Sequence, residues 1–147
     1  MSASLQIRQL DVFYGAVQVL RKVELDVAPG EIVCILGANG AGKTSLLRAV
    51  SNIMVRRQGE ILLDHANVSS LSADAIVRRG VAHVPDDRGT FAHLTVDENL
   101  RLGAYSRRSK GVEEDREQAL AYFPRLRERL HQQAGTLSGG DQQVLAI

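Results

Sequence analysis

The segment best suited to chemistry is Gly37-Ala38-Asn39-Gly40-Ala41-Gly42-Lys43-Thr44, which matches the spacing G-x-x-x-x-G-K-[ST] at every required position. Glycines allow the backbone to curl until successive N–H groups point at one anion, and a helix that follows adds the positive end of its dipole. Lys43 is long enough to reach the β- and γ-phosphates of a nucleotide, and the Thr44 hydroxyl can help to hold Mg²⁺. With the adjacent Ser45, this phosphate loop predicts binding of a nucleoside triphosphate. The alternative is a chance glycine-rich turn.

The flanks of the phosphate loop favour the nucleotide interpretation, because such a loop joins a strand to a helix. Residues 31–36 form a short apolar run rich in β-branched side chains, which predicts a strand. Residues 44–50 continue with helical spacing. We therefore expect the loop to lie at the start of a helix.

A second segment with chemical potential lies near the C-terminus, at Leu137-Ser138-Gly139-Gly140-Asp141-Gln142-Gln143. Taken alone, it predicts a helix start in which Ser138 is the N-cap and Asp141 is the third residue. A capped helix start also presents free N–H groups to an anion, so the structural and the functional interpretations are compatible.

The remaining patterns predict strands around the phosphate loop and helices in the part of the chain that leads to the second segment. Residues 23–27 and 61–63 alternate as half-buried strands do, and residues 81–84 predict a further strand. The pair Thr95 and Glu98 forms a capping-box pattern that starts a helix, and Pro124 must begin or kink a helical segment. We expect one domain over 1–147, with β and α/β material over 1–87, helical material over 88–140, and the start of another helix over 141–147.

Composition limits the classes of protein that this chain can belong to. With 147 residues, 44% hydrophobic content and a net charge of +1, it is an ordinary globular chain without a bulk charge that would favour nucleic acid. Cys34 is the only cysteine and falls in the predicted strand, so we expect a buried thiol in a reducing compartment. No apolar run approaches the roughly 20 residues of a membrane span. We expect a cytoplasmic protein that reaches a membrane only through a partner.

The phosphate loop and the second segment together resemble the ATP-binding subunit of ABC transporters, in which the second segment is called the signature. The resemblance covers essentially the whole chain. It implies an α/β fold, with a P-loop NTPase core, an N-terminal antiparallel β subdomain and a helical subdomain. It also implies ATP and Mg²⁺ as cofactors, a head-to-tail dimer with a second ATPase subunit, and integral membrane permease subunits as partners. In such a dimer, Ser138, Gly139 and Gly140 contact the ATP of the partner subunit.

Two further residues acquire candidate roles from this resemblance. Tyr14, in Val12-Phe13-Tyr14-Gly15, occupies the position of an aromatic residue that stacks on adenine; the alternative is a hairpin or core residue. Asp86 occupies a position at which relatives carry Gln or Glu, so it is a candidate catalytic residue and a candidate ligand to Mg²⁺. The alternative for Asp86 is a turn acid that follows Pro85.

The resemblance also suggests a cargo. Residues 123–129 and 134–140 are similar to the second ATPase subunit of branched-chain amino acid importers, which implies that ATP hydrolysis drives import of these amino acids. An ABC ATPase for urea, amides or lipids and a non-catalytic nucleotide-binding remnant remain as alternatives. Members of this family continue after the signature with a strand that ends in Asp-Glu, a further loop and a switch histidine. We expect this sequence to be incomplete at its C-terminus and to have little or no turnover alone.

Overall fold

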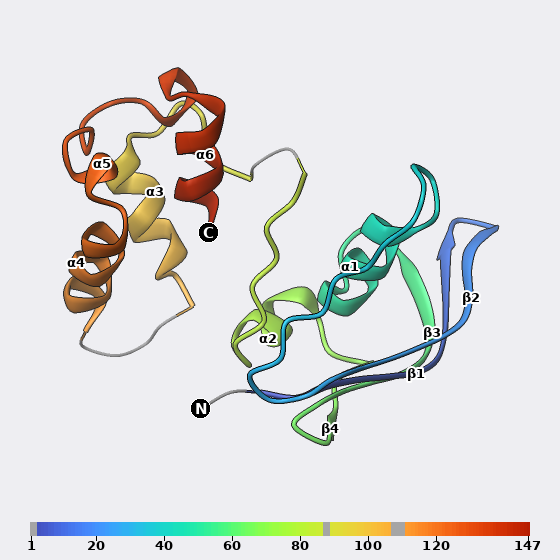
Figure 1. The fold of residues 1–147 in the computed structure, drawn as a ribbon. Coiled ribbons are helices and arrows are strands. Elements are labelled where there is room, and N and C mark those ends of the chain that lie inside the picture. Colours follow the sequence, from blue (N-terminus) through green and yellow to red (C-terminus); the bar gives the residue numbers. More distant parts are fainter. Residues whose placement is uncertain (1–2, 87–88, 107–110) are drawn as a thin grey trace. The chain divides into compact units, whose positions relative to one another are not determined.

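The computed structural model describes residues 3–86, 89–106 and 111–147. Within it the chain forms two compact units, Met1–His83 and Val84–Ile147, each of which is described separately below (Figure 1). The subdomain boundary expected between residues 87 and 88 lies outside the described residues.

The first unit is built on an antiparallel sheet with the order β2-β1-β3-β4. Its strands are β1 (Leu5–Tyr14), β2 (Val17–Val27), β3 (Arg56–Leu63) and β4 (Ala66–Asn67). The predicted alternation over 23–27 is confirmed, because Val23, Leu25 and Val27 are partly buried while the acidic residues between them are exposed. Half-buried strands of this type leave one face of a sheet to be covered by helices.

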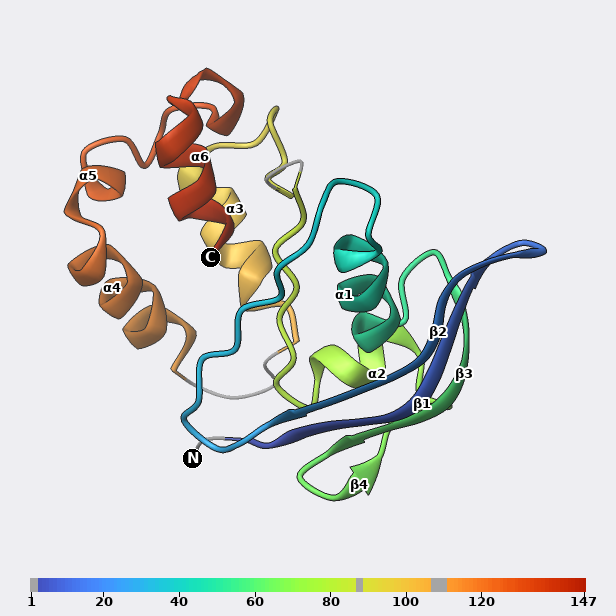
Figure 2. The same cartoon turned by 45° about the vertical axis from the view of Figure 1, so that its right-hand side comes forward.

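Two helices cover that face, α1 (Lys43–Ser51) and α2 (Ala73–Val77), as Figure 2 shows. The shared core contains buried side chains from the sheet, from α1 and from the segment after β4; these are Ile7, Leu10, Val12, Leu46, Ala49, Ile61 and Val68. Packing of α1 on the sheet holds the N-terminus of this helix in a fixed place, and that terminus carries the phosphate loop.

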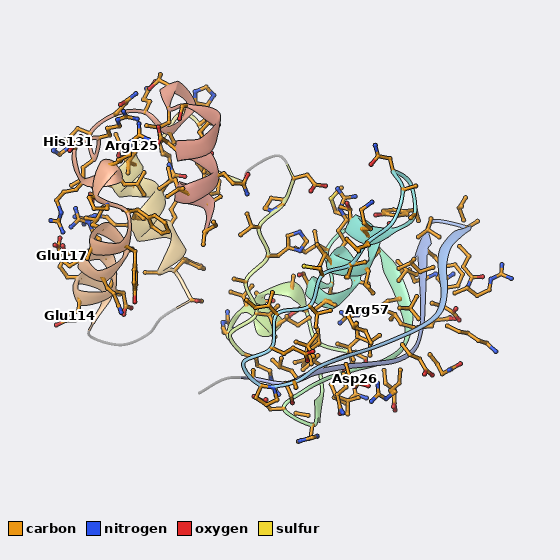
Figure 3. The ribbon with its side chains drawn as sticks, viewed as in Figure 1. Asp26, Arg57, Glu114, Glu117, Arg125 and His131 are labelled. Atoms are coloured by element: carbon orange, nitrogen blue, oxygen red, sulfur yellow. The ribbon has the colours of Figure 1, made fainter. Side chains whose placement is uncertain are left out.

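The guanidinium of Arg57 joins the C-terminal end of α1 to the rest of the unit. It donates to the carbonyl oxygens of Ala49 and Val50 in α1, and to those of Val68, Ser69 and Leu71 after β4. Figure 3 labels this side chain beside α1. Burial lowers the pKa of Arg57.

Two predicted strands are wrong. Residues 31–36 and 81–84 contain no assigned strand, and Cys34, expected to be buried, is exposed. A strand is stable only when a neighbouring strand satisfies its backbone groups. Within the part of the chain that the structure describes, no strand pairs with either segment. Ile32 and Leu36 are accordingly 92% and 91% exposed.

The second unit is helical. Its elements are α3 (Val96–Gly103), α4 (Val112–Tyr122), α5 (Pro124–Arg127), the 3₁₀ turn η1 (Ala134–Thr136) and α6 (Gly139–Ala146). They enclose a second core of buried side chains, namely Val96, Leu120, Leu126, Ala134, Leu137 and Leu145. This core fixes the approach of η1 to α6, where the signature lies.

Local signals at the helix starts of this unit are confirmed. The Thr95 hydroxyl accepts from the Glu98 N–H at 3.2 Å, and the Thr95 N–H donates to the Glu98 carboxylate at 2.7 Å, which completes the capping box. Pro124 is the first residue of α5, where its missing N–H and fixed φ cost nothing. Across the residues with described structure, no helix has the length and apolar character needed to cross a bilayer.

Candidate functional site

The phosphate loop is an exposed turn that runs directly into α1. Gly42 is the N-cap of this helix with φ +93°, and Gly40 has φ +84°. Both values lie in the left-handed region, which glycine adopts without a steric penalty. The Leu46 N–H donates to the Gly42 carbonyl at 2.9 Å, so α1 begins immediately after the loop. The first N–H groups of the helix thus face the loop, as an anion site requires.

The Lys43 side chain folds back over the loop. Its ammonium donates to the carbonyl oxygens of Gly37 at 2.8 Å and Ala38 at 2.9 Å. The ammonium therefore lies against the first two residues of the loop. Thr44 follows as the second residue of α1 and is partly buried.

Tyr14 lies next to the phosphate loop, although β1 is distant from the loop in sequence. The Tyr14 hydroxyl lies 3.3 Å from the Ser45 hydroxyl and accepts from the Arg48 guanidinium at 3.2 Å. These two contacts, Ser45 first, lower the pKa of Tyr14. The hydroxyl is thus attached to the first two turns of α1. Sequence reasoning did not single out Arg48; its spacing of three residues from Ser45 on one helix face was the available signal.

The signature segment, Ser138, Gly139 and Gly140, forms the start of α6 and is exposed. The Ser138 hydroxyl accepts from the Asp141 N–H at 3.2 Å, which confirms the predicted N-cap. Ser138, Gly140 and Asp141 also line a pocket of about 380 Å³ with residues of the α4–α5 corner and Val144. Arg125, labelled in Figure 3, belongs to that lining.

Comparison with known proteins identifies the family. The model of the ABC transporter family matches residues 20–147. The chain belongs to the ABC transporter family. It is 39% identical over 143 residues to the high-affinity branched-chain amino acid transport ATP-binding protein BraG of Pseudomonas aeruginosa, covering 97% of this chain and 61% of that protein. It is 34% identical over 139 residues to the probable branched-chain amino acid transport ATP-binding protein LivF of Archaeoglobus fulgidus, covering 95% and 59%.

Solved ABC structures have the same fold as this chain. The ATP-binding subunit of an ABC transporter superposes with a TM-score of 0.78 at 29% identity, over 97% of this chain and 59% of that one. A dimeric bacterial ABC transporter cassette gives 0.80 at 24% identity, over 97% and 67%. The predicted fold class is confirmed by these likenesses together with the antiparallel sheet and the helical unit. The chain spans about three fifths of the length of the curated relatives named above, 61% and 59%.

The candidate residues of this ABC chain fall into two groups. The first unit brings together Tyr14, Ser45 and the phosphate loop. The second unit contains the signature and Asp86, which is exposed in a turn after Pro85.

The described residues offer a magnesium ion few protein ligands. Among the described residues, no three His, Cys, Asp or Glu side chains gather as a metal site would need. Mg²⁺ that accompanies a nucleotide usually takes one or two protein oxygens and otherwise phosphate and water oxygens. The Thr44 hydroxyl, at the end of the phosphate loop and in the first turn of α1, fits that limited role.

Proposed function

We propose that this chain is the ATP-binding part of an ABC ATPase subunit that drives the import of branched-chain amino acids. The observation that carries the proposal is the phosphate loop, in which the Lys43 ammonium lies over a glycine-rich turn at the N-terminus of α1. The names of the relatives BraG and LivF support the cargo.

In the proposed site, the backbone N–H groups of the loop and the Lys43 ammonium bind the phosphates of ATP. A bound Mg²⁺ would neutralise phosphate charge, with the Thr44 hydroxyl as its protein ligand. The Tyr14 ring would stack on the adenine, an interaction that typically contributes about 1–3 kcal/mol per base. Its contacts with Ser45 and Arg48 restrict the ring before ATP arrives, which lowers the entropy cost of stacking.

The signature serves a second subunit in this proposal. Ser138, Gly139 and Gly140 would contact the γ-phosphate of ATP held by the partner's phosphate loop, in a head-to-tail ATPase dimer. Asp86 would contact Mg²⁺ or the attacking water through a further water, since its side chain is one methylene shorter than Glu. The helical unit would bind integral permease subunits, which would hold the protein on the cytoplasmic face of the membrane.

Titration with a fluorescent ATP analogue in the presence of Mg²⁺ tests nucleotide binding. The chain contains no tryptophan, so the signal comes from the analogue alone. Lys43→Ala removes the ammonium and should raise the dissociation constant at least about tenfold, the size expected for one charge-assisted contact to phosphate.

The matched control is Lys22→Ala. Lys22 is exposed on β2, and its N–H, which the substitution keeps, donates to Asp11. This variant should bind the analogue as the unsubstituted chain does. Equal affinity of the Lys43→Ala variant and the unsubstituted chain, or no binding by either, would refute the proposed site.

A further inference from the structure

The residue that follows the signature is Asp141, the third residue of α6, and its carboxylate is buried. The residue is only 7% exposed. Its Oδ2 atom accepts from the Ser138 hydroxyl at 2.6 Å and from Nη1 of Arg129 at 2.7 Å. Nη1 of Arg125 lies 3.8 Å from the other carboxylate oxygen. A charged side chain buried to this degree requires a partner of opposite charge.

The contact with Asp141 determines what Ser138 can offer to a ligand. A hydroxyl has one proton to donate. At 2.6 Å that proton lies between Ser138 Oγ and the carboxylate, while Oγ itself accepts from the Asp141 N–H. Phosphate oxygens are acceptors and need donors. In this arrangement the donors at the start of α6 are the N–H groups of Gly139 and Gly140, which have no partner within a helix at these positions.

The negative charge of the Asp141 carboxylate disfavours an anion at the start of α6. The Ser138 hydrogen bond, followed by the charges of Arg125 and Arg129, keeps the pKa of Asp141 below its ordinary value, so the group is ionised at neutral pH. An uncompensated negative charge in the same helical turn as the Gly139 and Gly140 amides would repel phosphate.

We propose that Arg129 is a positioning residue that cancels the charge of Asp141 and holds its carboxylate against Ser138, so that the amides of Gly139 and Gly140 can receive the terminal phosphate of a nucleotide bound to a second copy of this chain. This inference rests on the proposed function of the signature.

Arg129 is better placed for this role than Arg125. Its guanidinium contacts the carboxylate at hydrogen-bond distance, and its side chain is 33% exposed, whereas that of Arg125 is 74% exposed and its closest approach is 3.8 Å. Exposed ion pairs contribute little, because water screens them. Arg125→Gln is therefore a matched control, since it removes the same kind of side chain from the same carboxylate.

The test uses the whole chain labelled with ¹⁵N and titrated with Mg²⁺ and the slowly hydrolysed analogue ATPγS. The amide signals of Gly139 and Gly140 report the signature, and those of Gly40 and Gly42 report the phosphate loop. Arg129→Gln should weaken the binding seen at the signature about tenfold, the scale of one charge near a helix terminus. Arg125→Gln should change it by less than about threefold, as expected for an exposed pair.

The decisive variant is Arg129→Gln combined with Asp141→Asn. An Asn side chain can still accept from Ser138 but has no charge, so the double variant restores a pair of zero net charge and should bind within about threefold of the unsubstituted chain. A merely structural Arg129 predicts that the loss persists in the double variant, which would overturn the inference. This comparison also stands if Arg129→Gln alone fails to fold.

The signature and loop signals separate two kinds of failure. Binding at Gly40 and Gly42 that does not depend on Lys43 would refute the proposed function. Lys43-dependent signals at the loop, with no response at Gly139 and Gly140 or with no effect of Arg129→Gln on it, would refute only the role of Arg129.

Discussion

Replacement of Arg57 by methionine should destabilise the first unit more than any other single arginine change in the sheet. Methionine retains most of the apolar stem of arginine but removes every donor. Three carbonyl oxygens receive the shorter hydrogen bonds of Arg57, those of Ala49, Val68 and Ser69. The variant removes these donors from a partly buried position.

The size of the expected loss in stability depends on which of these carbonyl oxygens still accept a hydrogen bond from another donor in the Arg57→Met variant. The Ala49 oxygen keeps the Asn52 N–H at 3.2 Å, and the Val68 oxygen keeps the Leu71 N–H at 3.1 Å. The Ser69 oxygen loses both its contacts with Arg57, at 2.9 and 3.2 Å. One unsatisfied carbonyl and two weakened ones give an expected loss of about 3 kcal/mol in the free energy of unfolding.

Urea titration followed by the amide signals of Ile7 and Ile61 measures this loss, because both residues are fully buried in the core of the first unit. Arg56→Met is the matched control. Arg56 is the neighbouring, exposed residue of β3, and its guanidinium carbon lies 4.0 Å from the centre of the Phe13 ring. Such a cation–π contact contributes about 0.5–1 kcal/mol at an exposed site. A loss for Arg57→Met within experimental error of the control would refute the reasoning.

Two further predictions concern backbone geometry and pH. Gly59→Ala should abolish the pairing of β1 with β3, because the new Cβ would lie 2.5 Å from the Gln9 carbonyl oxygen; loss of native far-UV circular dichroism is the expected result, and a native spectrum would contradict it. Gly103→Ala is the control, since it meets open space at the end of α3 and should stabilise by about 0.5–1 kcal/mol. Burial alone would raise the pKa of Asp97, but its contacts with Arg116 and Arg101 outweigh burial and hold the pKa below 3.8. A carboxylate with a lowered pKa in the folded state stabilises at higher pH and loses that contribution as pH falls from 3.8 through the folded value. The free energy of unfolding of the second unit should therefore fall more steeply in acid than that of its Asp97→Asn variant. If the two stability curves fall in parallel with pH, the ion pair contributes nothing and the prediction is wrong.

Much of the candidate site could be predicted because its signals are local. The phosphate loop depends on glycines at fixed spacing, and the structure has Gly40 and Gly42 at positive φ there. The capping box of Thr95 and the N-cap of Ser138 likewise involve residues within one turn of each other. Interactions over such short separations are encoded by residue type and spacing alone.

Strands were predicted less well, because a strand depends on partners elsewhere in the chain. The apolar run 31–36 has the composition of a buried strand, yet its side chains, Cys34 included, are exposed where no described strand pairs with it. Composition gives a segment its tendency to form a strand, and the strand forms only if another strand pairs with the segment.

The amino-acid sequence by itself determined the glycine-rich loop that we propose as the phosphate site, the place of Lys43 in that loop, and which residues begin several of the helices. Only the tertiary structure placed Tyr14 against Ser45, Arg57 at the end of α1, and Arg129 on the carboxylate beneath the signature. The physical reason is the separation in sequence between the residues that interact. Backbone turns and caps are set by neighbours in sequence, whereas hydrogen bonds between distant side chains exist only after the cores have brought their elements together.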